Sequence, residues 1–322
     1  MHTVRLVCAA LAATCLLALP SAAPAAAPHV VGIGEQNDSI FASAPWHRLK
    51  ARDVRYVVAW DALDVKWQRD EADAYLAAAE HAHARVLLGF SHSRSRFKAR
   101  RKTLPSPVRY RRMFLRFRAR YPFIKEYLTW NEANHRGQPT WNHPKLAGRY
   151  YDILRNNCRE CTIVGPSVLD SSKMPAWVKQ VEKAAKHRIG IWAIHNYIDA
   201  NRFRTSGTRS LLRATKAKIW FTETGGLVRR DNGSKIEFAD SPKHAVQATK
   251  WVLKLARLSP RVRRVYFYHW TAPAPKATWD SALTDRRGRP RPAYRVVRTF
   301  VRRLRAATRK ATRRRAAARA RR

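Results

Sequence analysis

The stretch Ile124–Gly137, IKEYLTWNEANHRG, joins a short strand-like run to a cluster of polar side chains. The run ends at Trp130, and the acid Glu132 follows almost directly. Similar short apolar runs recur along the chain, at residues 29–36, 54–60, 84–90, 162–168, 190–197, 217–224 and 263–270. Strands that are followed at once by polar residues are typical of a parallel sheet whose working groups stand at the strand ends.

Longer amphipathic runs separate the strand-like runs. They predict helices near residues 43–51, 70–83, 107–120, 143–157, 174–187, 207–214, 240–258 and 291–305. Eight strand–helix units in roughly 275 residues favour a single-domain α/β fold, the (β/α)8 TIM barrel, over residues 29–301. An open dinucleotide-binding sheet is disfavoured because GIGEQN, residues 32–37, does not complete the GxGxxG pattern. We therefore expect no nicotinamide cofactor.

Residues 1–25 have the composition of a secretory signal peptide. Arg5 supplies positive charge, Leu6–Leu19 is apolar, and Ala23-Pro24-Ala25 offers a cleavage site with small residues. The apolar run is too short and too rich in alanine for a good membrane span, and no later segment approaches about 20 uninterrupted apolar residues. We expect a protein that is secreted or associated with the cell envelope and has no transmembrane span.

Two cysteines, Cys158 and Cys161, follow the expected cleavage site. In an exported protein a local disulfide that closes the turn before the next strand is the expected state. A structural zinc site usually takes four ligands, and no second Cys/His pair stands nearby. We expect neither a metal nor an organic cofactor.

The chain is strongly basic, with a formal net charge of +43 from 65 Lys plus Arg and 22 Asp plus Glu. Residues 302–322 contain eleven basic side chains and no acid. Such a tail, disordered or helical, is expected to bind polyanions with a strong salt dependence. For an exported protein an anionic cell-envelope polymer is a nearer partner than nucleic acid. The alternative is that the arginines reflect sequence bias and solubility.

Polar residues at the carboxyl ends of the predicted strands form a coherent set. Two acids stand out, Glu132 after the fourth strand and Glu223 at the end of the seventh. In a barrel the two would face each other across the mouth, where a retaining glycosidase needs one carboxylate as acid/base and one as nucleophile. Other polar or aromatic residues at these strand ends are His195, Asn196, Tyr197, His269 and Trp270.

Several neighbours of the two acids could bind a sugar. Asn131 is placed to hydrogen-bond a sugar 2-hydroxyl, and His195 or Tyr197 to orient Glu223. Trp270 offers a flat apolar face for a sugar ring. Residues that could extend the sugar site are Trp60, Trp130, Trp141 and His92, with Glu35 and Gln36 toward a distal sugar.

These motifs resemble the clan A glycoside hydrolases, the retaining 4/7 superfamily, over about residues 29–300. The resemblance rests on WNE (130–132), HNY (195–197), TETG (222–225) and the tryptophan that closes the eighth strand, and is closest to family 39 and family 5 type enzymes. It implies Glu132 as acid/base, Glu223 as nucleophile with Tyr197 as hydrogen-bond partner, Asn131 as a sugar-binding residue and Trp270 as the floor of the cleaved-sugar subsite. NEAN replaces the commoner Asn-Glu-Pro, and the pattern identifies no early-strand arginine of the family 5 kind.

Other interpretations stay open at this point. Glu132 could cap a helix or pair with an arginine, Glu223 could begin a turn, and Tyr197, Trp60 and Trp141 could pack in the core. At the level of function, the barrel could bind an anionic wall or matrix polysaccharide without cutting it, with the tail supplying most of the affinity. An exported nucleic-acid-binding protein is a second alternative, which is suggested by charge alone.

Overall fold

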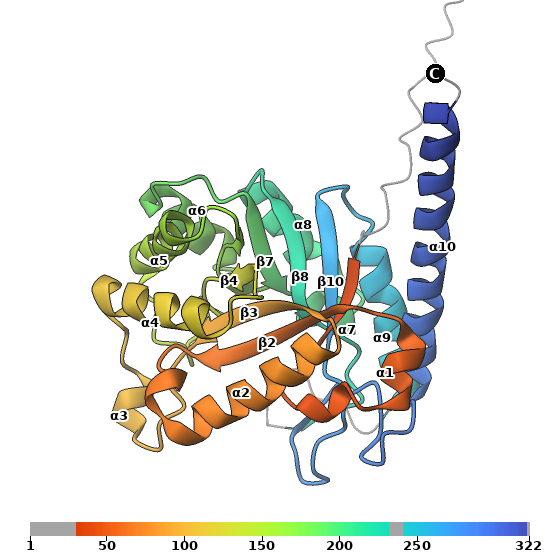
Figure 1. The fold of residues 1–322 in the computed structure, drawn as a ribbon, viewed down its shortest axis with the longest axis horizontal. Helices are drawn as coiled ribbons and strands as arrows, with labels where there is room; N and C mark the ends of the chain where they lie inside the picture. Colours follow the sequence, from red (N-terminus) through yellow and green to blue (C-terminus); the bar gives the residue numbers. More distant parts are fainter. Residues whose placement is uncertain (1–29, 232–240, 321–322) are drawn as a thin grey trace, which may run out of the picture.

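The computed structural model describes residues 30–231 and 241–320, so the expected signal peptide, residues 1–25, lies outside the described residues. A parallel sheet forms the centre of the molecule and helices surround it (Figure 1). The strands of this sheet, in spatial order, are β5 (Thr162–Val164), β4 (Glu126–Leu128), β3 (Arg85–Ser91), β2 (Asp53–Ala59), β1 (Val30–Gly34), β10 (Val262–Tyr268), β8 (Lys218–Thr224), β7 (Ile191–His195) and β6 (Ser167–Leu169).

The two strands at the ends of this order, β5 and β6, are consecutive pieces of one predicted strand. Pro166 has no backbone N–H and interrupts the ladder between them. β5 pairs with β4 and β6 pairs with β7, and the Gly165 N–H donates to the Ile191 carbonyl at 2.8 Å. The sheet therefore closes on itself with eight strand positions, which confirms the predicted (β/α)8 barrel.

The helices fall close to their predicted ranges. Three of them begin with the same local arrangement, in which a serine side chain caps the backbone and a proline occupies the first turn: Ser43 caps α1, Ser106 caps α4 and Ser241 caps α9. The barrel helices are α1 (Ala44–Leu49), α2 (Lys66–His81), α4 (Pro107–Arg120), α5 (Pro144–Asn157), α6 (Met174–Ala184), α8 (Ser206–Ala214), α9 (Pro242–Leu255) and α10 (Pro292–Ala320). Short elements that were not predicted are η1 (Asp38–Ile40), η2 (Ala62–Asp64), α3 (Lys98–Arg101), α7 (Tyr197–Asn201) and the hairpin of β9 (Arg229–Arg230) with β11 (Trp279–Asp280).

Side chains fill the barrel interior, as in other barrels of this class. The interior layer consists of Leu87, Leu128, Val164, Ala193, Trp220 and Tyr266. Gly32 on β1 makes room for the Tyr266 ring, because a Cβ atom at Gly32 would lie 2.7 Å from that ring. A larger apolar layer lies between the strands and the surrounding helices. The packed interior leaves only the ends of the barrel for polar chemistry.

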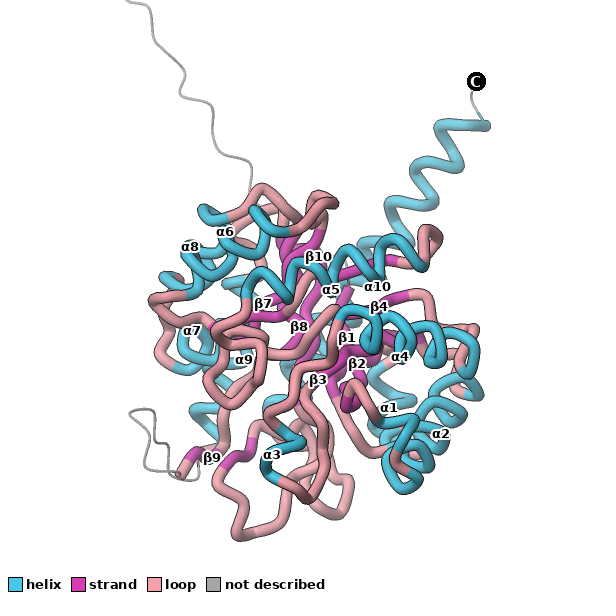
Figure 2. Tube along the Cα trace, turned by 90° about the vertical axis from the view of Figure 1, so that its left-hand side faces the viewer, coloured by secondary structure: helices cyan, strands magenta, loops and turns pink. Residues whose placement is uncertain are grey.

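The C-terminal helix α10 crosses the boundary that the sequence suggested near residue 302 without a break. Its first turns belong to the core: Val297 and Phe300 are buried, and the Tyr294 hydroxyl donates to the Pro45 carbonyl at 2.9 Å. Residues 305–313 are exposed, and this part of the helix projects beyond the barrel (Figures 1 and 2). The basic tail is helical through Ala320.

Two further expectations concern the described residues. Cys158 and Cys161 form the expected disulfide, with their Cα atoms 5.3 Å apart, directly after α5. Within residues 30–231 and 241–320, none of the helices combines the length and the apolar character that a membrane crossing requires.

Candidate active site

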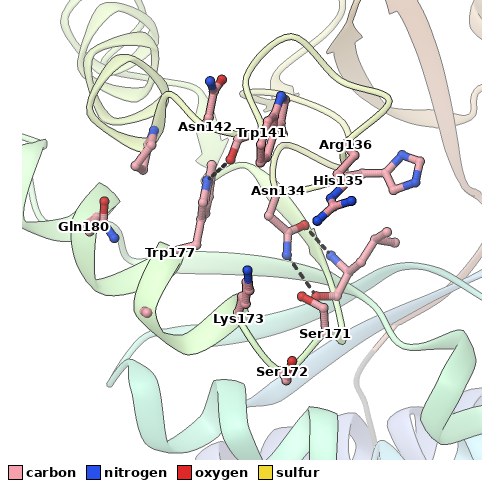
Figure 3. A pocket seen from close by; sticks show the side chains of 13 residues that line it. Asn134, His135, Arg136, Trp141, Asn142, Ser171, Ser172, Lys173, Trp177 and Gln180 are labelled. Carbon is pink, nitrogen blue, oxygen red and sulfur yellow. Dashed lines mark hydrogen bonds between the residues drawn. The ribbon is translucent and has the colours of Figure 1, made fainter.

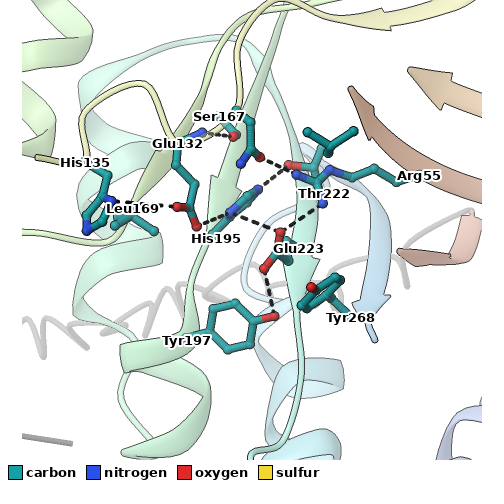
Figure 4. A network of polar contacts seen from close by, with 12 residues as sticks. Arg55, Glu132, His135, Ser167, Leu169, His195, Tyr197, Thr222, Glu223 and Tyr268 are labelled. Atoms are coloured by element: carbon teal, nitrogen blue, oxygen red, sulfur yellow. Dashed lines mark hydrogen bonds and ion pairs between the residues drawn. The ribbon is translucent and has the colours of Figure 1, made fainter. Parts of the chain in front are cut away.

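A network of polar side chains lies at the carboxyl ends of the strands (Figure 4). Glu132 stands in the loop between β4 and α5, Glu223 is near the end of β8, and His195 ends β7. One oxygen of each carboxylate and one ring nitrogen of His195 all lie within 4.8 Å of one another. Two acids that are far apart in sequence therefore meet at the barrel mouth.

Glu132 is held by both its backbone and its side chain. Its φ angle of 49° places it in the left-handed region, which costs a non-glycine residue about 1–3 kcal/mol. Its N–H donates to Ser167 Oγ at 2.7 Å, and its Oε1 lies 3.0 Å from His195 Nδ1. His135 Nδ1 lies 4.0 Å from the other carboxylate oxygen. The strained backbone and these contacts fix the direction in which the carboxylate points.

Both oxygens of Glu223 are also fixed. Arg55 Nη1 donates to Oε2 at 2.9 Å, and the Tyr197 hydroxyl donates to Oε1 at 3.2 Å. Arg55 is 1% exposed and also donates to Asn131 Oδ1. One guanidinium thereby connects the nucleophile candidate to the amide beside Glu132.

Arg55 is an arginine on an early strand that the sequence pattern did not single out. It lies on β2 in the run VRYVVAW, residues 54–60, as the one charged side chain among apolar and aromatic residues. A cation inside a buried strand requires a partner, because burial of an isolated charge is costly. That signal was present in the sequence, but the partner, Glu223, is 168 positions away.

His195 is fully buried and lies close to both acids. Its Nδ1 lies 3.0 Å from Glu132 and 3.7 Å from Glu223, and its Nε2 lies 3.1 Å from Thr222 Oγ1. Burial raises the pKa of Glu132, but the hydrogen bond with His195 and the charges of His135 and Arg55 outweigh burial and bring the pKa below its ordinary value of 4.5.

A cavity of about 560 Å³ opens above the two acids. This volume is typical of small-molecule sites. The lining residues are Glu132, His135, Leu169, Asp170, Ser171, His195, Tyr197, Ile198, Glu223, Arg230, Tyr268, His269, Pro273 and Trp279. The predicted Glu132, Glu223, His195 and Tyr197 thus share one cavity, and Asn131 joins them through Arg55.

Two predicted binding residues, Trp270 and Trp60, lie outside the cavity. Trp270 and Trp60 are each 1% exposed: Trp270 packs edge-on against Trp46 and Tyr294, and Trp60 lies under the Arg109 guanidinium. The expectation that these two indoles offer faces to a sugar is corrected, because both are buried in the core.

The remaining residues that were predicted to bind sugar, His92, Glu35 and Gln36, have polar side chains. His92 is half-buried, lies 3.3 Å from Ser91 Oγ and is not among the described residues that line the cavity. Glu35, assigned to a distal sugar, instead accepts from the backbone N–H groups of Trp270 and Thr271 and so fixes the end of β10. The Gln36 amide donates to the Val57 carbonyl.

Two of the cavity residues that sequence reasoning missed bear directly on the chemistry of the cavity, Trp279 and Asp170. Trp279 on β11 is half-buried and contacts the Tyr197 ring edge-on, with ring centroids 4.8 Å apart, so it supplies the aromatic wall that Trp270 does not. Asp170 directly follows β6. Burial and the negative charge of Asp199 raise the pKa of Asp170 to about 7, although the hydrogen bond from the Asp199 N–H lowers it. Its place directly after the fifth predicted strand was the available signal.

The two acids and His195 are also a donor set that can bind a cation. The guanidinium of Arg55 lies 2.9 Å from Glu223, however, and it already supplies positive charge where a cation would bind. The arrangement fits acid, base and nucleophile chemistry better than metal coordination.

Comparisons with known proteins agree with this geometry. A family model described as glycosyl hydrolase catalytic core matches residues 117–295. GH5_18 from Streptomyces cattleya, solved in complex with GlcNAc, is 16% identical with a TM-score of 0.61, and the match covers 87% of this chain and 81% of that chain. A monomeric beta-xylosidase from Caulobacter crescentus CB15 is 15% identical with a TM-score of 0.60 (86% and 69% covered). A family 39 glycoside hydrolase from Bacteroides cellulosilyticus WH2 is 13% identical with a TM-score of 0.57 (85% and 64% covered).

At these identities the structural likeness concerns the fold. None of the curated proteins that were compared with the chain matches it. The family model spans more than half of the chain, including Glu132, His195 and Glu223. The chain belongs to the glycosyl hydrolase catalytic core family.

Proposed function

We propose that this protein is a retaining O-glycosidase that cleaves an oligosaccharide or polysaccharide by double displacement, outside the cytoplasm. Glu223 is the nucleophile and Glu132 is the acid/base. The observation that carries the proposal is the short distance between the two carboxylates, whose oxygens come within 4.8 Å across the cavity.

This distance favours retention over inversion. Retaining enzymes hold their two carboxyl groups about 5–5.5 Å apart, whereas inverting enzymes need about 6.5–9.5 Å to admit a water molecule. One oxygen of Glu132 and one of Glu223 lie within 4.8 Å of each other, which is shorter than the separation that an inverting enzyme needs to admit its water. Direct attack by a carboxylate on the sugar is the reaction that this spacing supports.

In the first step Glu223 Oε attacks the anomeric carbon, and the glycosidic C–O bond breaks as Glu132 gives its proton to the departing oxygen. In the second step Glu132 takes a proton from water, the water oxygen attacks the same carbon, and the Glu223–sugar ester bond breaks. Arg55 and Tyr197 hold Glu223 for the attack. We assign Asn131, which accepts a hydrogen bond from Arg55, to the sugar hydroxyl next to the reacting carbon.

The exposed part of α10 favours a second, separate function. Residues 302–322 carry eleven basic side chains, and residues 305–313 are exposed along the projecting helix. We propose that this segment anchors the enzyme to an anionic cell-envelope polymer through counterion release. A chain truncated after residue 304 should retain hydrolysis of small glycosides and lose salt-sensitive binding to the polymer. Equal loss of binding to DNA and to the polymer would show a general polyanion site.

Export is tested by the N-terminus of the protein recovered from a bacterial culture. If residues 1–25 are a signal peptide, protein outside the cytoplasm should begin near residue 26. A full-length N-terminus on protein that stays in the cytoplasm would contradict export.

The experiment for the catalytic proposal is hydrolysis of a panel of glycans and aryl glycosides, with the first-formed anomer identified by proton NMR. We expect a product with the substrate's anomeric configuration, and loss of turnover in Glu132→Gln and in Glu223→Gln. Lys66→Gln, which changes an exposed residue of α2 that does not line the cavity, is the control variant. Inverted product, or full turnover in either glutamate variant, would overturn the assignment.

A further inference from the structure

A second and larger cavity adjoins the catalytic one (Figure 3). Its volume is about 720 Å³, and it shares His135, Leu169 and Ser171 with the catalytic cavity. Its remaining lining residues come from the loop after β4 and from the start of α6: Asn134, Arg136, Trp141, Asn142, Pro144, Ser172, Lys173, Ala176, Trp177 and Gln180. The two cavities therefore meet at a shared wall beside Glu132.

Hydrogen bonds hold the loop that separates the two cavities. Asn134 donates to the Leu169 carbonyl at 3.1 Å and accepts from the Leu169 N–H at 2.8 Å, so one side chain ties the loop after β4 to the end of β6. Trp177 Nε1 donates to the Trp141 carbonyl at 3.0 Å and anchors the outer part of the same loop on α6. Sites that are ordered before the ligand arrives bind it at a smaller entropic cost.

The chemistry of the second cavity suits an acidic sugar. Trp141 is 43% exposed and presents an indole to the cavity, as sugar-binding surfaces do. Arg136 and Lys173 line the cavity, and no acid is among its lining residues. Within residues 30–231 and 241–320 neither cation is paired with an acid, and the Arg136 guanidinium lies 6.0 Å from the centre of the Trp141 ring. Two cations, an aromatic face and several amide and hydroxyl groups together match a glycan that carries negative charge.

The position of the second cavity indicates which side of the scissile bond it would bind. Glu132 as general acid must stand next to the departing oxygen, whereas Glu223 attacks from the opposite face of the sugar. Both acids line only the first cavity, but the second cavity begins at His135, whose Nδ1 is 4.0 Å from Glu132, so it adjoins the acid/base side of the site. The sugar that becomes covalently bound to Glu223 therefore occupies the first cavity. The part of the substrate that departs extends into the second cavity.

We infer that the second cavity binds the departing part of the substrate, and that this part carries an acidic group, such as the carboxylate of a uronic acid, between Arg136 and Lys173. The inference rests on the proposed glycosidase function and adds the substrate class to it. It also requires a substrate of at least two sugar residues.

Net charge alone makes many surfaces of this protein bind anions, so the test must separate the cavity from the rest. The test variant is Arg136→Gln with Lys173→Gln. The control is Lys179→Gln with Lys183→Gln, which removes the same charge from exposed positions of α6 outside the cavity. Trp141→Ala is paired with Trp67→Ala, since Trp67 on α2 is 46% exposed and lies outside the cavity.

Each variant is made in a Glu223→Gln background, and its affinity for short uronate-containing, sulfated and neutral oligosaccharides is measured by calorimetry. We expect the cavity variant to lose roughly threefold to tenfold in affinity for uronate-containing oligosaccharides and nothing for neutral ones, whereas the α6 control changes neither. Trp141→Ala should weaken both classes, and Trp67→Ala should weaken neither. An equal loss for sulfated oligosaccharides would assign the site to acidic sugars in general.

Equal losses in the cavity variant and the α6 control, or no binding of any acidic oligosaccharide, would overturn the inference. Hydrolysis by the parent enzyme separates the two proposals. If the parent cleaves glycans while the cavity variant binds normally, the inference fails and the glycosidase proposal stands. If the parent cleaves none and the cavity variant still loses affinity selectively, the binding site stands without the catalytic function.

Discussion

Each end of the barrel interior holds a pair of carboxylates, and the two pairs have different partners. At the amino ends of the strands, Arg264 donates to both oxygens of Glu126 at 2.6 and 2.8 Å, and Arg85 donates to Asp53 at 2.8 Å. The Arg264 guanidinium also lies 3.9 Å from the centre of the Trp220 ring. Two acids thus face two arginines.

At the carboxyl ends, Arg55 pairs with Glu223, and the buried His195 lies near both Glu132 and Glu223. A buried histidine takes the place of a second arginine partner here, the backbone of Glu132 is strained, and a cavity leaves room for a ligand. A cluster of acids paired with arginines contributes to folding, whereas a strained cluster beside a cavity is retained for function. The difference separates a structural end of the barrel from a working end.

The sharpest way to break this comparison is to neutralise one acid at each end. Glu223→Gln should lower kcat by about 10⁴-fold or more, because the nucleophile is lost. Glu126→Gln is the matched change at the other end, and it should leave kcat within a few-fold of the parent. Steady-state kinetics on a cleaved glycan measures both. Similar losses in the two variants would remove the distinction between the ends.

A somewhat smaller effect is expected at the acid/base. Glu132→Gln should lower kcat by about 10²- to 10⁴-fold on natural glycans, the usual contribution of general acid–base catalysis. On an aryl glycoside with a good leaving group the first step needs little proton transfer, so a burst of released phenol should precede slow turnover. Rapid-quench kinetics detects the burst. An equal loss in the first step for good and poor leaving groups would argue against this role.

At the structural end the expected loss is in stability. Arg264→Ala leaves Glu126 without its bidentate partner and should lower the free energy of unfolding by about 3 kcal/mol, the scale that is typical for a broken buried ion pair. Urea denaturation measures this free energy. The exposed pair Lys66–Asp70 on α2 is the control, since Lys66→Ala should cost less than about 1 kcal/mol. A loss as small as that control would mean that the base cluster does not stabilise the fold.

The smallest predicted effect is a shift in pH dependence. The hydrogen bond with His195 lowers the pKa of Glu132 against the effect of burial, so kcat/KM should fall as pH rises above that pKa, and activity should be higher in mildly acidic solution than at neutral pH. His195→Ala removes the lowering contribution, which raises the pKa of Glu132 and moves the alkaline limb to higher pH. An alkaline limb that stays in place or moves to lower pH would contradict the role given to His195.

The order of strands and helices could be predicted from the sequence, because the spacing of apolar residues and the positions of turn residues are local properties of the chain. All eight strand-like runs became strands, and the predicted helix at residues 107–120 matches α4 residue for residue. The division of the predicted strand 162–168 into β5 and β6 was not predicted. It depends on Pro166, which interrupts the hydrogen bonds at the point where the strand changes from pairing with β4 to pairing with β7. The continuation of α10 beyond residue 305 was left open as disordered or helical.

The site was predictable where a residue's role depends on its strand end. Glu132, Glu223, His195 and Tyr197 were placed correctly at the mouth for that reason. Whether an aromatic side chain faces the cavity depends on packing against distant helices, so Trp270 and Trp60 were misplaced and Trp279 was missed. Arg55 was missed because its importance comes from contacts with Glu223 and Asn131, which no local pattern reveals.

The most direct test of the central claim is mass spectrometry of Glu132→Gln after brief exposure to an aryl glycoside that the parent enzyme cleaves. Without its base the variant should accumulate the intermediate, and the peptide that contains Glu223 should gain the mass of one glycosyl residue. Glu223→Gln, treated in the same way, should gain none. Release of phenol without any covalent sugar, or a sugar on a peptide that lacks Glu223, would contradict the two-glutamate mechanism.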